Sequence, residues 1–554
     1  MKVPACFCIG AALVAVVLTA TAQEEGTPSQ AKKNTLPGKP VGNQPGRLEW
    51  LQDAGFGMFI HYSLDSQLGS VISHSMVGAS EDYLKRYYDL AKTFEPRMWN
   101  PDNVCALAKL CGMRYVVFTA KHHNGFCWWD TKTTDFNILN TPYRKDVLAE
   151  YVRACRKYGL AVGLYYSPED FRWQHQHGFA ITRNITEYDP EIHPAFTKFV
   201  ESQVRELMTR YGKIEVLFID GVGKEITKRT TWTLQPECLI TRGAIETPEQ
   251  TVPGIGLEGA WEANLTMGTQ WAYKPTHEEY KSGTRLIEIL IETRAKGGSL
   301  LLNVGPKPNG ELPIEQEERL REIALWHTVN SEGVHDTRPW IVTHEANLWF
   351  TKKKNESTVY CFVTKIPDWP RGSRKEFILR SIRATKDTRI SVLGQNDKVV
   401  EYNPDTDARS RFNQKEDGLH VSVVRAQRLY NNHKWPNPIC IKIERVEPAL
   451  VPPRVRTMEG VRRNGETLFS GDIIALGDAP QVKAGFRYRV YAGFAENMES
   501  DVWEGEIVTE TASKGAFSVT APGLKPGTYE IQAFVIHPSG LKMFGEKIQV
   551  KIES

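Results

Sequence analysis

Ile214-Glu-Val-Leu-Phe-Ile-Asp220-Gly221 is an apolar run with β-branched residues that ends in a carboxylate followed at once by glycine. A run of this kind is typical of a parallel strand that is buried on both faces. At the carboxyl end of such a strand, side chains leave the packed core and point into the mouth of an α/β barrel. A half-buried carboxylate costs free energy unless it is paired or used in chemistry. Asp220 is therefore either a catalytic residue or a cap or ion-pair partner, and this stretch alone does not decide between them.

Strand-like runs alternate with amphipathic helical stretches between residues 46 and 340. The strand-like runs cover residues 55–62, 115–121, 160–167, 214–220, 237–242, 259–266 and 299–304. The helical stretches cover residues 81–92, 101–111, 145–158, 192–211, 286–296 and 315–331. This alternation predicts a (β/α)8-like parallel barrel over residues 46–340. Residues 221–280 carry little helical pattern, so we expect the barrel to be irregular there.

Beyond Trp340 the pattern changes to short runs rich in Val, Ile, Tyr and Phe, separated by turn residues. Such runs predict an antiparallel β-sandwich over residues 341–447 and a second, immunoglobulin-like β domain over residues 454–554. In the second, Tyr529 follows a Pro-Gly turn and resembles the tyrosine corner of immunoglobulin-like domains. The predicted fold class is thus α/β, a barrel followed by two β-sandwich domains.

The first 22 residues combine a short basic start, an apolar run and an Ala-Thr-Ala cleavage site. We interpret residues 1–22 as a secretory signal peptide, because the apolar run is too short to span a membrane. Residues 23–45 are rich in Gln, Lys, Gly and Pro and predict a disordered linker. The protein is therefore expected to be exported, to the periplasm or the extracellular space, with no membrane span.

Composition excludes several classes of function. The formal net charge of +3 argues against nucleic acid as a partner but is compatible with a neutral sugar. The nine cysteines include Cys6 and Cys8 of the expected signal peptide, and the others form no CxxC pair, so we interpret them as small buried residues. His122 and His123 are adjacent and should point to opposite faces of a strand, and no HExxH motif occurs. We therefore expect no metal and no cofactor.

Ionisable and aromatic side chains collect at the ends of several predicted strands, and a later strand carries Glu262. They are His61, His122, His123, Tyr166, Glu169, Asp170, Asp220 and Glu262. Any one of them could be structural, but barrel active sites form where such strand ends converge, so the whole set favours a functional site. Two carboxylates surrounded by His, Tyr and Trp suit glycoside hydrolysis. One carboxylate attacks or stabilises the anomeric carbon while the other protonates the leaving oxygen.

Over residues 46–445, the order of the motifs resembles the α-L-fucosidases of glycoside hydrolase family 29. The motifs are Phe56-Gly-Met-Phe-Ile-His61-Tyr62, Thr119-Ala-Lys-His122-His123-Asn-Gly-Phe126, Gly163-Leu-Tyr-Tyr166-Ser167, Phe218-Ile-Asp220-Gly221, Lys296-Gly-Gly-Ser-Leu-Leu-Leu-Asn303-Val-Gly-Pro306 and Thr337-Arg-Pro-Trp340. The resemblance implies an exo-acting, retaining enzyme that releases terminal α-L-fucose from an oligosaccharide or glycoconjugate.

The resemblance also implies roles for individual residues. Asp220 matches the family's nucleophile, and Glu262 is similar to its acid/base, with Glu246 and Glu249 as alternatives. The residues implied to bind the sugar are His61, Glu81, His122, His123, Tyr166, Trp261 and Trp271.

The chain departs from the family after the first strand, where Glu81-Asp82-Tyr83 replaces the usual Glu-Trp-Tyr. An Asp in place of a Trp would remove an apolar wall and make the subsite near the C5 substituent more polar. An α-L-galactoside or a decorated fucose is therefore an alternative substrate. A catalytically inactive carbohydrate-binding protein is the second alternative.

Overall fold

The computed structural model describes residues 42–182, 189–365, 369–426, 437–463, 466–493, 502–509, 511–521 and 523–553. Residues 40–554 form one compact unit. The expected signal peptide at 1–22 and most of the expected linker at 23–45 lie outside the described residues. Among the helices that are described, none combines the length and the apolar character needed to cross a membrane. The cysteines at positions 105, 111, 127, 155, 238, 361 and 440 are buried and free.

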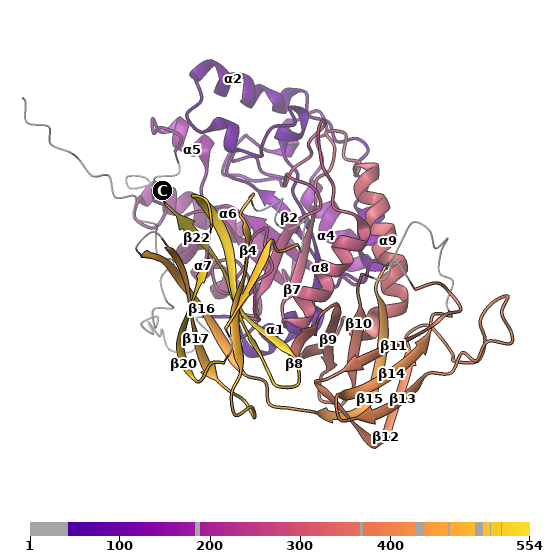
Figure 1. Ribbon diagram of the computed structural model, residues 1–554. Coiled ribbons are helices and arrows are strands. Elements are labelled where there is room, and N and C mark those ends of the chain that lie inside the picture. The colour runs from indigo at the N-terminus through magenta and orange to yellow at the C-terminus, as the bar shows by residue number, and fades with distance from the viewer. Residues whose placement is uncertain are drawn as a thin grey trace, which may run out of the picture. The chain divides into compact units, whose positions relative to one another are not determined.

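A curled parallel sheet of seven strands, in the order β5-β4-β3-β2-β1-β7-β6, forms the first part of the fold (Figure 1). Its strands are β1 (Phe56–Ile60), β2 (Tyr115–Lys121), β3 (Ala161–Tyr166), β4 (Val216–Ile219), β5 (Leu239–Ile240), β6 (Glu262–Thr266) and β7 (Ser299–Val304). The helices are α1 (Pro45–Ala54), α2 (Glu81–Asp89), α3 (Pro101–Leu110), α4 (Val147–Lys157), α5 (Phe171–Gln176), α6 (Pro194–Arg210), α7 (Lys224–Leu234), α8 (Gly283–Ala295) and α9 (Ile314–Asn330).

Local sequence signals explain where these elements begin and how deeply they lie. Asn100 caps α3 by accepting a hydrogen bond from the Asn103 N–H, and Asp146 caps α4 in the same way. Every residue of β4 is buried, as expected for an apolar strand covered on both faces. The helix α7 lies in the region 221–280, where the sequence pattern is weak.

The sheet is closed between β5 and β6 by irregular backbone. Three isolated parallel bridges run along this side, Arg242 with Ile245, Glu246 with Trp261, and Glu249 with Asn264. The Glu262 N–H donates to the Glu246 carbonyl, so this segment takes the place that a further strand would fill. The irregularity expected for residues 221–280 is thus found here.

Two groups of antiparallel strands follow the parallel sheet, as predicted. The first group is β8 (Thr337–Glu345), β9 (Leu348–Lys353), β10 (Val359–Val363), β11 (Arg374–Leu379), β12 (Ile382–Val392), β13 (Arg411–Lys415), β14 (Gly418–Val424) and β15 (Ile439–Pro448). The second is β16 (Arg454–Arg463), β17 (Glu466–Ala475), β18 (Lys483–Val490), β19 (Gly505–Val508), β20 (Gly515–Ala521), β21 (Gly527–Ile536) and β22 (Lys542–Ile552). The Tyr529 hydroxyl donates to the Lys525 carbonyl, the contact that defines a tyrosine corner.

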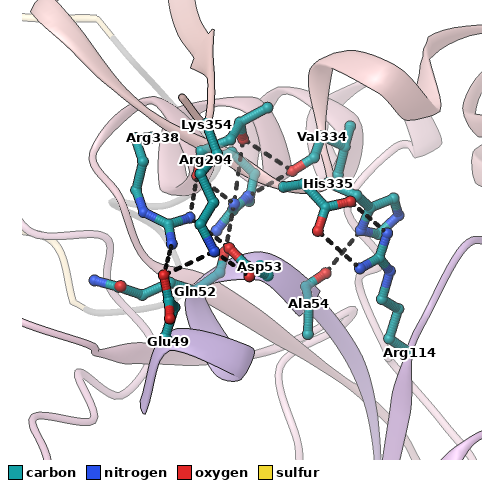
Figure 2. A network of polar contacts seen from close by, with 12 residues as sticks. Glu49, Gln52, Asp53, Ala54, Arg114, Arg294, Val334, His335, Arg338 and Lys354 are labelled. Atoms are coloured by element: carbon teal, nitrogen blue, oxygen red, sulfur yellow. Dashed lines mark hydrogen bonds and ion pairs between the residues drawn. The ribbon is translucent and has the colours of Figure 1, made fainter. Parts of the chain in front are cut away.

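A polar network at the amino-terminal end of β1 joins α1 to β8 and β9 (Figure 2). Arg294 is buried and donates to the carbonyls of Gln52, Gly298, Val334 and Thr337. Arg338 and Lys354 both pair with Asp53, at 2.7 and 2.8 Å. Segments that are far apart in sequence therefore meet at this network.

Candidate active site

Asp220 lies directly after β4, where its side chain is 23% exposed. Its Oδ2 accepts a hydrogen bond from the Tyr165 hydroxyl at 2.9 Å, and its Oδ1 accepts from the Gly221 N–H at 3.0 Å. Arg242 Nη1 lies 3.3 Å from Oδ1, and His123 Nε2 lies 3.6 Å from Oδ2. Charge-assisted donors of this kind stabilise a carboxylate, and the remaining exposure leaves it open to a ligand.

Each of three histidines is fixed by a polar partner. His61, after β1, contacts Asn303 Oδ1 on β7 through Nδ1 at 2.7 Å. His122 Nδ1 lies 2.7 Å from the hydroxyl of Ser73. His123 Nδ1 lies 2.6 Å from the hydroxyl of Ser167. Burial is the main reason that the pKa of His61 falls to about 4, so His61 is neutral near pH 7.

The prediction that His122 and His123 point to opposite faces is wrong. The pairing of β2 with β3 shifts register between Thr119 and Lys121, and the strand ends at Lys121. A bulge of this kind re-aims the side chains that follow it. The ligand atoms of His122, His123 and Asp220 consequently lie within 4.8 Å of one another, a spacing that could also hold a cation.

Aromatic rings line the same side of the barrel. The ring of His122 stacks on that of Tyr165 with centroids 5.2 Å apart and an interplanar angle of 4°. Trp271 is half-buried, and its ring lies 4.9 Å from that of His61. Asn303 Nδ2 donates to the Trp271 carbonyl at 2.7 Å, which fixes this loop against β7. The structure thus brings His61, His122, His123 and Trp271 together around Asp220.

Glu262, interpreted above as the acid/base, lies at the other end of the barrel. It is the first residue of β6 and pairs in register with Ser299, the first residue of β7. Its Oε2 accepts from the Tyr115 hydroxyl at 2.5 Å. Asn303, which contacts His61, is four residues further along β7, and at 3.3 Å per residue this places Glu262 about 13 Å below it. Glu262 therefore cannot share a substrate with Asp220, and its assignment as acid/base is corrected.

Tyr166 and Trp261 face the helices and not the barrel interior. The Tyr166 hydroxyl donates to Gln203 on α6, and the side chain is fully buried. Successive strand residues point to opposite faces, so Tyr165 occupies the inward position on β3. Trp261 is buried against Gly298. Neither residue is placed to bind a sugar, which corrects both assignments.

Glu81 and Asp82 lie in the first turn of α2, which begins after the cap residue Ser80. The Glu81 side chain is 84% exposed and pairs with His175 on α5 at 2.9 Å. Asp82 is 75% exposed and pairs with Arg86 one turn later. These contacts direct both carboxylates to the surface, so Glu81 is not brought to Asp220 and Asp82 adds no acceptor to the pocket.

No sequence pattern marks Arg242, and Glu249 is one of the two alternative acid/base candidates. Arg242 Nη1 contacts Asp220, and its Nη2 contacts Glu249 Oε2 at 2.7 Å. One guanidinium therefore joins two carboxylates, and the Glu249 side chain is 40% exposed. Glu246 is also exposed, but its described contact with β6 is through its backbone carbonyl. Because alternate residues of a strand point to the same face, the alternation along the strand, rather than the motif, identifies Tyr165 as an inward-pointing residue. The irregular segment 242–250 has no such repeat, so the sequence does not indicate where its side chains point.

Comparisons with known proteins show the family and the fold of this chain. Residues 22–332 match the family model described as α-L-fucosidase. An α-L-fucosidase of Dictyostelium discoideum is 26% identical over 365 residues, which cover 58% of this chain and 78% of that protein.

Solved structures show the same fold. α-L-Fucosidase isoenzyme 1 of Paenibacillus thiaminolyticus has a TM-score of 0.58 at 23% identity, over 72% of this chain and 99% of its own. An α-L-fucosidase of Bacteroides thetaiotaomicron, trapped as a covalent intermediate with 2-fluoro-fucosyl fluoride, has a TM-score of 0.59 at 20% identity, over 74% of this chain and 99% of its own. Since the family model matches more than half of its length, this chain belongs to the α-L-fucosidases of glycoside hydrolase family 29.

Proposed function

We propose that the protein releases terminal α-L-fucose by retaining double displacement, with Asp220 as the nucleophile and Glu249 as the acid/base. The observation that carries this proposal is the guanidinium of Arg242, which contacts both carboxylates. Both groups are partly exposed, as groups that reach a substrate need to be. Retaining glycosidases place two carboxyl groups about 5–5.5 Å apart across the anomeric carbon.

The chemistry proceeds in two balanced steps. First, an Asp220 oxygen forms a bond to C1 while the bond from C1 to the leaving oxygen breaks, and that oxygen takes a proton from the Glu249 carboxyl. Second, a water oxygen attacks C1 and its proton passes to the Glu249 carboxylate, while the bond between C1 and Asp220 breaks. A solved relative trapped as a covalent intermediate supports this sequence of events.

The other residues of the site would bind the sugar. His61, His122 and His123 present imidazole rings from the ends of β1 and β2, with one ring nitrogen of each already held by a polar partner. Trp271 offers an apolar surface to the C–H face of the ring. Tyr165 and Arg242 stabilise the charge of Asp220 before attack and after release.

Azide rescue tests the two roles separately. In Glu249→Ala, two displacements remain, so azide should restore turnover of an aryl fucoside and give α-L-fucosyl azide. In Asp220→Gly, azide enters by a single displacement and should give β-L-fucosyl azide. Measuring the anomeric configuration of each product by NMR checks both, and Glu249→Gln serves as the isosteric control. If azide does not restore turnover of Glu249→Ala, and the kcat/KM of this variant does not depend on the leaving group, the acid/base assignment is contradicted.

We also propose that residues 1–22 direct export and are then removed. The basic start, apolar run and Ala-Thr-Ala site support this. Amino-terminal sequencing of the protein recovered from the periplasm or medium should begin near residue 23. A chain that retains Met1 and stays in the cytoplasm would contradict it.

A further inference from the structure

The backbone directly after Glu249 is enclosed on two sides. We call residues 251–256 the seam loop. On one side, Lys296 Nζ at the end of α8 donates to the Pro253 carbonyl at 2.6 Å. A Cβ added to Gly256 would lie only 2.4 Å from the Lys296 carbonyl oxygen. This side of the loop is therefore in close contact with the barrel.

The other side of the seam loop contacts the last sandwich. A Cβ added to Gly254 would lie 2.5 Å from the Lys547 nitrogen and 2.9 Å from the Gly545 carbonyl oxygen, both on β22. These are backbone atoms, so no side-chain rotation relieves such a contact. Gly254 has no left-handed φ, so its own backbone would accept alanine. Only the neighbouring strand requires glycine here.

The sandwich surface under Gly254 is itself held in place. Gln532 on β21 donates from Nε2 to the Gly545 carbonyl at 2.6 Å. Its Oε1 accepts from Arg487 on β18 at 2.9 Å. β21 and β22 pair along most of their length. The loop therefore contacts β22, the edge strand of this sheet, next to the irregularity in its pairing with β21, where Gln532 holds the Gly545 carbonyl.

Charges tie the barrel to the same surface. Lys296 Nζ pairs with Glu292 at 2.6 Å, and Lys547 Nζ lies 4.0 Å from the same carboxylate. Burial lowers the pKa of Lys296 to about 8, with Glu292 opposing the shift. The pKa of Glu292 is lowered, because the attraction of Lys296, Lys547 and Arg285 outweighs its burial. Buried pairs of this kind fix geometry, since moving one partner leaves an unpaired charge.

We propose that β21 and β22 of the last sandwich position the acid/base carboxylate of Glu249 through the seam loop. This inference rests on the proposed role of Glu249. Gly254 and Lys296 are positioning residues, since they act on the backbone that leads away from Glu249 and touch no substrate. The family model ends at residue 332, so the supporting strands lie outside the matched part of the chain. The last sandwich is then part of the scaffold of the active site and not an independent appendage.

The test is the Gly254→Ala variant of the full-length protein, assayed with fucosides of graded leaving-group ability. A misplaced general acid slows only substrates whose leaving oxygen needs a proton. We expect kcat/KM to fall by about tenfold or more for a disaccharide with a poor leaving group, and to stay within about threefold for an activated aryl fucoside. Hydrogen exchange of the peptide that covers residues 247–256 should rise as well.

Gly471→Ala is the matched control. Its Cβ would meet the Phe517 ring within the last sandwich, so it strains that sandwich without touching the seam loop. The inference is supported if Gly254→Ala shows the leaving-group dependence and Gly471→Ala does not. It is overturned if Gly254→Ala slows both substrates equally or neither, or if Gly471→Ala behaves in the same way.

A second variant covers the case in which Gly254→Ala does not fold. Glu292→Gln/Lys296→Met removes two buried charges together and deletes the hydrogen bond to the Pro253 carbonyl. The same leaving-group dependence is expected, and its absence in a folded protein overturns the inference. Glu249→Ala, assayed in parallel, separates the two proposals. If Glu249→Ala shows the dependence and the positioning variants do not, only the further inference fails. If Glu249→Ala lacks it, both fail.

Discussion

Tyr165 and Tyr166 are neighbours on β3, yet their hydroxyls end on opposite sides of the sheet. Tyr165 donates to Asp220 inside the barrel, while Tyr166 donates to Gln203 on α6. Two phenols of the same chemistry therefore have different roles, because successive residues of a strand face opposite ways. The difference can be measured by removing one oxygen at a time.

We expect Tyr165→Phe to lower kcat/KM by about 10- to 100-fold, since a hydrogen bond to a charged group contributes about 1.5–3 kcal/mol. Tyr166→Phe should leave kcat/KM unchanged and reduce the free energy of unfolding by about 1 kcal/mol, the usual net contribution of a neutral hydrogen bond. Steady-state kinetics and urea unfolding of both variants check this. The reverse pattern would contradict the assignment of faces.

Glu262→Gln should keep kcat/KM within about threefold of the wild type, because Glu262 lies about 13 Å from the catalytic end of the barrel. Burial raises the pKa of Glu262 from its usual value of 4.5 to about 7. The folded state then holds the proton more tightly, so this stabilising contribution is present below pH 4.5 and is lost as pH rises through 7. Replacement by the neutral amide removes that dependence.

The melting temperature of Glu262→Gln should accordingly exceed that of the wild type at pH 8, and the two should converge near pH 4. Thermal unfolding across this range gives the comparison. A large loss of activity toward poor leaving groups, with the fold intact, would restore Glu262 as a candidate acid.

Acid should unfold the protein partly through two buried imidazoles. His327 and His335 lie with their Nε2 atoms 2.8 Å apart, and His335 Nδ1 contacts the Ala54 carbonyl. Burial, with Arg114 nearby, lowers the pKa of His327 to about 4 and that of His335 to about 2. In both cases the unfolded chain binds protons more readily, so stability is present above pH 6.5 and falls as pH drops toward 4.

The free energy of unfolding measured at pH 7, 5.5 and 4 should therefore decline. His327→Gln, which keeps a polar side chain at this position, should decline less over the same interval because one of the two titrating groups is gone. An identical slope in both proteins would show that other groups control acid unfolding.

Arg242→Ala should lower kcat/KM by about 100-fold, because the Asp220 carboxylate loses its cationic partner. Added guanidinium should restore part of the rate if the pocket is otherwise intact. Arg242→Lys, whose single ammonium cannot span both carboxylates, is the matched variant and should recover less than full activity. Rates equal to the wild type without guanidinium would exclude Arg242 from the site.

The sequence was sufficient to predict the strands that carry the site, but not the direction in which each side chain points. His61 and Asp220 follow the ends of β1 and β4 and Trp271 packs near His61, while the roles of all three stay predictions. The motif marks Tyr166 as the end of the strand but does not show that Tyr165 is the residue that points inward.

For the carboxylates, the structure differs from the expectation in where a strand begins. Glu262 is the first residue of β6. The candidate acid Glu249 lies in irregular backbone that forms an isolated bridge with Asn264 of β6. The apolar pattern predicts a strand over 259–266 but not that it begins at Glu262, so it does not show that Glu262 lies at the amino-terminal end, away from the site. The segment 242–250 has no regular repeat, so long-range contacts with β6 determine its path and only the structure shows it.

The arginine at position 294 limits how the chain can be shortened. Its guanidinium is satisfied by carbonyls contributed from before β1, from before β7 and from the start of β8. The Val334 carbonyl is a further acceptor. Cutting the chain after residue 332, where the family model stops, would remove the acceptors at Val334 and Thr337 and leave two donors of a buried cation without partners. A shortened chain should therefore keep Val334 and Thr337, and with them Lys354, which pairs with both Glu49 and Asp53 of α1.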